Sequence, residues 1–480
     1  MLLVPLIAAW PALTTPPVQT RAQKVLYDKQ NAAAAMASAA ATPAVLNLLS
    51  QPEFRSGLAQ CCSDVASLPS EDLLSRFREE ILVAELAHNF PSSPSGNGSH
   101  WLDETLDTMQ QYPWFLNQWQ AKLIPHEASR AIGDGNRVEL FDPRRTSATR
   151  LDMSMSDAEV GIFGCAPFAA GPDQPTWDEA ADRLIYVALN LRQRDTGNSD
   201  HFGEVSAIFR RSSVDPLVLI APVDTGIWEG SCNATDPANP WKDLNCSYWA
   251  SRTVGTFEHF DHLILGNTGT WSGGGQSGPA RTLANQTARL FARTALSSGG
   301  YAALPALESS EVEAYWESNV VGNPRLEAIS FLIGTFGALF GTGAGRSLQS
   351  VATSKGWPVV WALGAADAGG HSSKEPASWP ANKRLLDPTT GNALTNRSTS
   401  TTSSAAFEQL WQQASEARAQ LPPGQPPSVD TVQGWWKQLE AAQLVRLAPL
   451  TARACSDVDK CIGTVVGDVE DDEMECVCTM

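Results

Sequence analysis

The sequence predicts an α+β fold in which a central mixed or antiparallel β-sheet is flanked by helices at both ends of the chain. Two observations predict it. Apolar residues near the N-terminus recur at three- and four-residue steps, which is the period of a helix, whereas the middle of the chain carries short alternating apolar segments. Strands gathered in the middle with helices before and after are typical of an α+β domain and not of a regular βαβ repeat.

Composition divides the 480 residues into five regions. They are a leader (1–44), a helical region (45–122), an α+β core domain (123–365), a polar linker with a helix (366–430) and a cysteine-containing acidic tail (431–480). The leader opens with a short apolar run that resembles a signal-peptide core. It continues into an alanine-rich, mainly basic stretch similar to a transit segment. This favours the secretory pathway or the extracellular space, and the alternative is a complex plastid reached through a bipartite leader.

Helices are predicted from periodicity and from capping signals. Residues 43–90 carry helical periodicity, and Ser70 followed by two acids is typical of a helix N-terminus. The other predicted helical segments are 101–123, 282–296, 308–316 and 403–421. The proline-rich residues 422–427 end the last helix, and the apolar segment 327–339 is expected to be buried.

Strands are predicted where apolar residues alternate or run together over a short length. They are 138–141, 160–163, 184–189, 205–209, 217–221 and 257–265. Segments 184–189 and 205–209 are expected to pair with each other across a polar loop, with Gly203 marking a bulge or a close backbone approach. Arg183, Tyr186, Asn190 and Glu204 then lie at strand ends, where functional sites are usually built.

Net charge argues against two classes of partner. The chain carries −18 at neutral pH, and an acidic surface attracts neither nucleic acid nor an anionic membrane. No apolar run has the length of a membrane-spanning helix, so no integral membrane segment is predicted. Six carboxylates crowd residues 468–475, and their mutual repulsion predicts that residues 468–480 stay outside the core.

Cysteines and acceptor triplets point to an oxidising compartment and a glycoprotein. Cys232 and Cys246 flank a loop that contains two of the five N-glycosylation triplets, and the pair is expected to form a disulfide. Four of the nine cysteines lie in the acidic tail.

The sequence does not match two familiar catalytic motifs. The glycine run 341–347 lacks the residues of a phosphate-binding loop and is interpreted as a helix cap or packing turn. No Gly-x-Ser-x-Gly elbow exists, which disfavours a serine hydrolase. Cys165 is a conceivable thiol nucleophile, although a small buried residue at a turn is the favoured interpretation.

The segment Glu258-His-Phe-Asp-His262 concentrates ionisable groups. As a strand it would place Glu258 and His262 on one face, where they could act as an acid–base pair. They could also bind a metal together with His201, or form a satisfied polar edge of the sheet.

One stretch resembles known families. Arg183-Leu-Ile-Tyr-Val-Ala-Leu-Asn190 and His201-Phe-Gly-Glu204 resemble the R-P-x-Y-G-x-L-N-L and F-G core of a bacterial family of uncharacterised proteins, and are similar to divergent ADP-ribosyltransferase-type domains. Residues 163–168 and 346–361 resemble the flanking segments in the same order. The resemblance implies a split sheet that clamps nicotinamide adenine dinucleotide (NAD).

The resemblance also implies site residues. Arg183, Tyr186 and Asn190 would contact the dinucleotide, with His126 or Arg130 as an early-strand ligand. The catalytic carboxylate would be Glu258, with Asp261 in reserve, and Glu204 matches the F-G-E step.

The resulting functional hypothesis is a divergent ADP-ribosyltransferase-like protein that binds NAD as a co-substrate and holds no cofactor tightly. The sequence does not indicate the protein acceptor. The alternative is a non-catalytic secreted or lumenal glycoprotein, a binding module with the same core. A metal-dependent enzyme is the more distant alternative.

Overall fold

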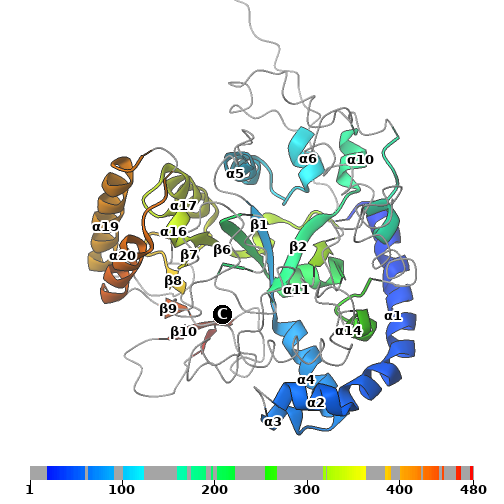
Figure 1. Cartoon of the computed structure of the whole chain (residues 1–480). Helices are drawn as coiled ribbons and strands as arrows, with labels where there is room; N and C mark the ends of the chain where they lie inside the picture. The colour runs from blue at the N-terminus through cyan, green and yellow to red at the C-terminus, as the bar shows by residue number, and fades with distance from the viewer. Residues whose placement is uncertain are drawn as a thin grey trace, which may run out of the picture.

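A computed structural model shows a mixed α and β structure built on a mixed sheet (Figure 1). The residues that it describes are 19–59, 63–90, 101–123, 159–169, 175–190, 196–197, 203–221, 254–266, 317–320, 322–363, 384–390, 401–422, 425–442, 446–447, 461–465 and 476–478. Helices precede and follow the strands along these ranges, so the predicted arrangement of sheet and flanking helices is confirmed at this level.

The described strands hydrogen-bond in the order β11-β10-β9-β8-β7-β6-β3-β1-β2-β5-β4. They are β1 (Glu85–Phe90), β2 (Ile185–Asn190), β3 (Val205–Phe209), β4 (Val218–Ile220), β5 (Glu317–Val320), β6 (Ile329–Thr335), β7 (Val359–Ala362), β8 (Arg384–Leu386), β9 (Arg446–Leu447), β10 (Cys461–Val465) and β11 (Cys476–Cys478). Strands β6 and β7 are parallel, whereas the other pairings are antiparallel. The chain between β6 and β7 forms helix α17, which provides the crossover that a parallel pair requires.

The helices surround the sheet. They are α1 (Arg21–Ser50), α2 (Pro52–Ala59), α3 (Ser63–Ala66), α4 (Ser70–Val83), α5 (Trp101–Gln111), α6 (Gln118–Leu123), α10 (Trp177–Ala181), α11 (Arg211–Val214), α14 (Asp261–Gly266), α16 (Phe336–Leu339), α17 (Gly343–Lys355), α19 (Thr401–Ala419) and α20 (Val429–Ala441), with the π-helix η2 (Glu159–Phe163) and the 3₁₀ helices η5 (Asp215–Leu217) and η8 (Leu326–Ala328). Helices α4, α5, α6 and α19 lie where the sequence predicts them. The glycine run at 341–347 starts α17, with the Thr342 hydroxyl accepting from the Gly345 amide, so its interpretation as a helix cap is confirmed.

Strands β2, β3 and β4 are confirmed, but the predicted pairing of β2 with β3 is wrong. Strand β1 lies between them and pairs with both. The sequence missed β1 because its residues were interpreted as the end of a helical pattern. Both sides of this strand are buried, so it lacks the apolar and polar alternation that marks a half-exposed strand.

Two other predicted strands are wrong. Residues 160–163 belong to the π-helix η2, and residues 257–265 form a turn followed by α14. The amide of Asp261, at the start of α14, donates to the Ser38 hydroxyl of α1 at 2.8 Å. A partner more than two hundred residues away therefore fixes this helix, and local sequence patterns do not report such a partner.

The two faces of the sheet differ in what covers them. The main core joins side chains such as Val187, Leu332 and Trp361 on one face to residues of most of the described helices, and we call this the helix-covered face. Residues at alternate positions point the other way. We call this the polar face, because it carries Glu85, Asn190 and other polar residues around a small apolar cluster of strand residues. That cluster consists of Ala87, Ile208, Phe331, Ile333, Val360, Ala362 and Leu386.

The boundary predicted for the leader at residue 44 falls inside α1. This helix is fastened to the body by side chains: Gln23 donates to the carbonyls of Ala181 and Arg183, and Thr42 donates to Asp261. Among the described residues, α1 is also the one helix whose length and composition would allow it to cross a membrane. Core helices and signal sequences share these properties.

The C-terminal region contributes to the fold in two places. Helix α20 packs Trp435 and Trp436 into the main core. Strand β11 pairs with β10, and the placement of residues 468–480 outside the core stays a prediction. The alternating Cys-Val-Cys sequence suits a strand despite the acids before it. The predicted Cys232–Cys246 disulfide, all five glycosylation triplets, strand 138–141 and helices 282–296 and 308–316 lie outside the described residues.

Candidate functional site

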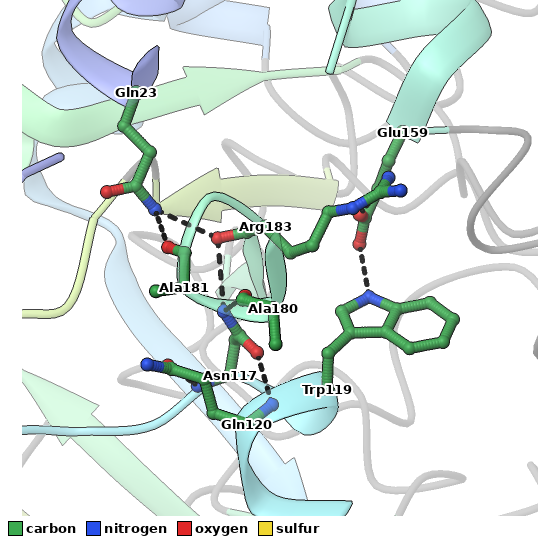
Figure 2. A network of polar contacts seen from close by, with 8 residues as sticks. All are labelled: Gln23, Asn117, Trp119, Gln120, Glu159, Ala180, Ala181 and Arg183. Atoms are coloured by element: carbon green, nitrogen blue, oxygen red, sulfur yellow. Dashed lines mark hydrogen bonds and ion pairs between the residues drawn. The ribbon is translucent and has the colours of Figure 1, made fainter. Parts of the chain in front are cut away.

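Two of the predicted site residues, Arg183 and Tyr186, meet at a carboxylate that the sequence did not single out, Glu159. Arg183 Nη1 lies 3.0 Å from Glu159 Oε2, and Trp119 Nε1 donates to Oε1 at 3.1 Å (Figure 2). The Tyr186 hydroxyl also hydrogen-bonds to Glu159. One buried carboxylate thus accepts from three different side chains.

The backbone around this carboxylate is held from several elements. Arg183 follows α10, whose capping box is formed by Thr176 and Glu179. The Arg183 carbonyl accepts from Gln23 of α1 at 3.0 Å and from Asn117 at 3.2 Å, as Figure 2 shows. Glu159 starts the π-helix η2, a rare conformation that occurs often at functional sites.

The Glu159–Arg183 pair is shielded from solvent, with side chains 0% and 1% exposed. The centre of the Phe168 ring lies 3.8 Å from the Arg183 guanidinium carbon. Burial raises the pKa of Glu159 to about 7, against the lowering effects of Arg183, Trp119 and Tyr186. A buried group with such a shift and a named charge partner is a functional-site candidate.

Cys165 lies next to this pair and packs with Phe163, Leu184 and Leu219. Burial, followed by the charge of Glu159, raises the pKa of its thiol. Nucleophilic cysteines need the thiolate, which this environment disfavours. The interpretation of Cys165 as a small buried packing residue fits this geometry.

Asn190 belongs to a second cluster, farther along β2 on the polar face. Its side-chain amide donates to Glu85 at 3.0 Å, and Glu85 forms a bidentate ion pair with Arg384 at 2.5 and 2.8 Å. The Arg384 guanidinium lies over the Phe331 ring, 5.9 Å from its centre. This cluster joins β1, β2 and β8 at one end of the apolar cluster.

The two predicted late carboxylates occupy different surroundings, and neither lies on a strand. The Glu258 side chain is 79% exposed in a turn, 4.0 Å from His259 Nε2. Asp261 is buried, where it accepts from Arg78 Nε at 2.9 Å and from the Thr42 hydroxyl at 2.9 Å. The expected strand that would carry Glu258 into a cleft is therefore wrong, because these residues form a turn and a helix start.

The remaining predicted residues add little to either cluster. Glu204 precedes β3, and its carbonyl accepts from the Thr335 amide at 2.8 Å. His126 and His201 lie outside the described residues. Within the part of the chain that the structure describes, no group of three His, Cys, Asp or Glu side chains is placed to hold a metal ion.

Sequence reasoning missed Glu159, Glu85 and Arg384. Arg384 and Glu85 are 299 positions apart, so no local pattern connects them. A weak signal existed for Glu159, which is an acid directly before the apolar residues Val160 to Phe163.

No model of a known protein family matches the chain, and a search of curated proteins finds no significant match.

Proposed function

We propose that the chain is a binding protein that holds a nicotinamide dinucleotide, or a nucleotide of similar chemistry, on the polar face of its sheet. The observation that carries the proposal is the cluster of Asn190, Glu85 and Arg384 on that face. Interiors seldom bury such groups on the central strands of a sheet without a specific role.

The chemistry of the cluster suits a dinucleotide. Arg384 presents two parallel N–H donors to Glu85, and a guanidinium binds a phosphate with the same bidentate geometry. Glu85 and Asn190 carry acceptors and a donor of the kind that bind ribose hydroxyls. NAD is the first ligand to test, because the sequence resemblance assigns Tyr186 and Asn190 to its binding.

Binding without transfer is supported by the surroundings of the expected catalytic acids. Glu258 is exposed in a turn, and Asp261 is engaged by Arg78 and Thr42. A carboxylate that assists glycosidic cleavage must come within hydrogen-bond reach of the reacting sugar. Neither Glu258 nor Asp261 contacts the Asn190 cluster through any of these interactions.

The test is a thermal-shift and calorimetric titration of the full chain with NAD, ADP-ribose and nicotinamide. Ligand at a hundredfold over its Kd should stabilise the fold by about 2.7 kcal/mol. Arg384→Lys keeps the positive charge but loses the planar, bidentate guanidinium group. It should therefore weaken the binding of NAD and ADP-ribose by about tenfold or more. Arg325→Gln, which alters an exposed ion pair, is the matched control and should bind as the wild type does. Absence of any shift with all three compounds in the wild type would overturn the proposal.

ADP-ribosyl transfer is the second candidate, and one observation favours it. Glu159, whose pKa burial raises to about 7, contacts both Arg183 and Tyr186, which the resemblance assigns to the dinucleotide. If transfer occurs, Glu159→Gln should abolish nicotinamide release measured by chromatography, while Glu258→Gln should leave it unchanged. Loss of release with Glu258→Gln alone would instead restore Glu258 as the catalytic acid.

A further inference from the structure

Helix α1 turns several polar side chains toward the body of the protein, beside apolar ones such as Ala34. Gln30 donates to the Phe163 carbonyl and Asn31 accepts from Thr256, each at 2.8 Å. Ser38 and Thr42 bind Asp261, as described above. These bonds fix which side of α1 faces the body.

The outer side of α1 is charged near its start, at Arg21, Lys24, Asp28 and Lys29, and apolar between residues 30 and 45. Val25 is 62% exposed and Met36 is 76% exposed, and they are two of the four large apolar side chains exposed on the described part of the chain. The other exposed positions between 30 and 45 are Ala32, Ala39, Ala40, Pro43 and Ala44. At 100° per residue, Val25, Ala32, Met36 and Pro43 fall on one line along the helix. We call this line the α1 ridge, and in Figure 1 α1 forms the right-hand border of the molecule.

Charge is distributed unevenly along the ridge. Arg21 and Lys29 are exposed in its first third, in a chain whose net charge is −18. The acid nearest to them, Asp28, is paired with Lys24 at 3.0 Å. At the opposite end the exposed Glu53 of α2 follows directly, next to the carbonyl end of the α1 dipole. One end of the ridge is therefore positive and the other negative.

We propose that the α1 ridge binds the same ridge of a second copy of this chain, with the two helices antiparallel about a two-fold axis. Met36 lies at the middle of the 30-residue helix, so the axis passes beside it. Antiparallel pairing then sets Ala32 opposite Ala40 of the partner subunit, and Arg21 within reach of Glu53 of the partner subunit. The interface is self-complementary in both shape and charge, as a two-fold dimer requires.

The residue sizes favour a helix over a bilayer as the occupant. Alanine contributes little apolar area, and a helix that lies in a membrane interface usually presents large apolar or aromatic side chains. Small residues instead let two helix axes approach to about 8 Å, where backbone and side chains pack closely.

Light scattering coupled to size exclusion tests the proposal on the full chain. The wild type should have twice the mass of one chain, and Met36→Glu should halve that mass while the variant keeps the circular-dichroism spectrum of the folded chain, because Met36 is 76% exposed within one chain. Leu82→Glu is the matched control: Leu82 is an exposed large apolar residue on α4, 45% exposed, and its change should leave the dimer intact. A monomeric wild type would overturn the proposal.

Charge reversal tests the antiparallel register. Arg21→Glu and Glu53→Arg should each weaken the dimer, and the double variant should recover it, since the pair is restored across the axis. A dimer that Met36→Glu leaves unchanged, or a chain that is monomeric and sediments with anionic phospholipid vesicles, would refute the self-association and assign the ridge to another partner.

Discussion

The two faces of the sheet are made by the same strands, yet they serve different ends. On β7, Trp361 points to the helix-covered face, where it packs against Phe336, Phe340 and Trp411, while Val360 points to the polar face. On β2, Val187 joins the main core while Asn190 joins the Glu85–Arg384 cluster. Alternation along a strand thus lets one face form the main core, while the other combines a small apolar cluster with polar contacts.

The largest expected effect lies on the helix-covered face. Trp361→Ala should lower the free energy of unfolding by about 3–5 kcal/mol, because it removes a fully buried indole and leaves Asp387 without the Nε1 donor at 2.8 Å. Its neighbour Val360→Ala should cost about 2 kcal/mol. Chemical denaturation of both variants measures the contrast, and equal losses would contradict the division between the faces.

The second-largest effect on stability is expected at the buried Glu159–Arg183 ion pair. Glu159→Gln should lower the free energy of unfolding by about 3 kcal/mol, because Arg183 stays buried without its charge partner. The matched control is Glu408→Gln, which breaks an exposed ion pair with Arg346 and should have little effect. A Glu159→Gln variant as stable as the wild type would show that the pair does not hold this side of the sheet.

The two predicted catalytic carboxylates, Asp261 and Glu258, should differ clearly in how much they stabilise the fold. Asp261→Asn should cost about 1–2 kcal/mol, since it removes the negative charge that accepts from Arg78 and Thr42. Glu258→Gln should leave the melting temperature unchanged, because its side chain is exposed. If Glu258→Gln destabilised the protein more than Asp261→Asn, Glu258 rather than Asp261 would be the carboxylate that stabilises the fold.

The last prediction is a dependence of the stability on pH. The folded-state pKa of Glu159 is raised from 4.5 to about 7, so the folded chain binds more protons than the unfolded chain in that window, and this group's contribution to stability falls as pH rises through it. His88 acts in the opposite sense. Burial lowers its pKa below 6.5, so its contribution is lost as pH falls below that value. The free energies of unfolding of the wild type and of Glu159→Gln should be compared at about pH 5 and about pH 8. The comparison isolates the pH dependence that comes from Glu159, which should vanish in the variant.

Local patterns predicted the elements whose neighbours lie close in sequence. The strands at β2, β3 and β4 alternate or run as short apolar segments, and α4 repeats its apolar residues at helical spacing. Strand β1 was missed because both of its sides are buried, and α14 because its start depends on Ser38 of α1. These two errors have one cause, which is that tertiary contacts decided the local structure.

About half of the residues of the candidate site could be predicted from the sequence. Arg183, Tyr186 and Asn190 stood out at strand ends, and the structure places each of them in a polar cluster. Their partners come from segments far along the chain, and pairing over such separations leaves no trace in a single sequence. Helix α1 is a second case in which composition alone is a poor guide. Its apolar composition resembles a leader, although its polar side chains bind the body of the protein.

The position of β1 also has a consequence for how the protein is made. Strand β1 ends at residue 90, but its partner β3 is complete only at residue 209, which is 119 residues later. At about 5–20 residues per second, the ribosome takes about 6–24 seconds to cover that distance. Until β2 is complete at residue 190, this interior strand, with Leu86 and Phe90, has both edges unpaired by its final neighbours. Biosynthesis of this chain therefore depends on keeping one early strand from pairing with other chains until the middle of the protein has emerged.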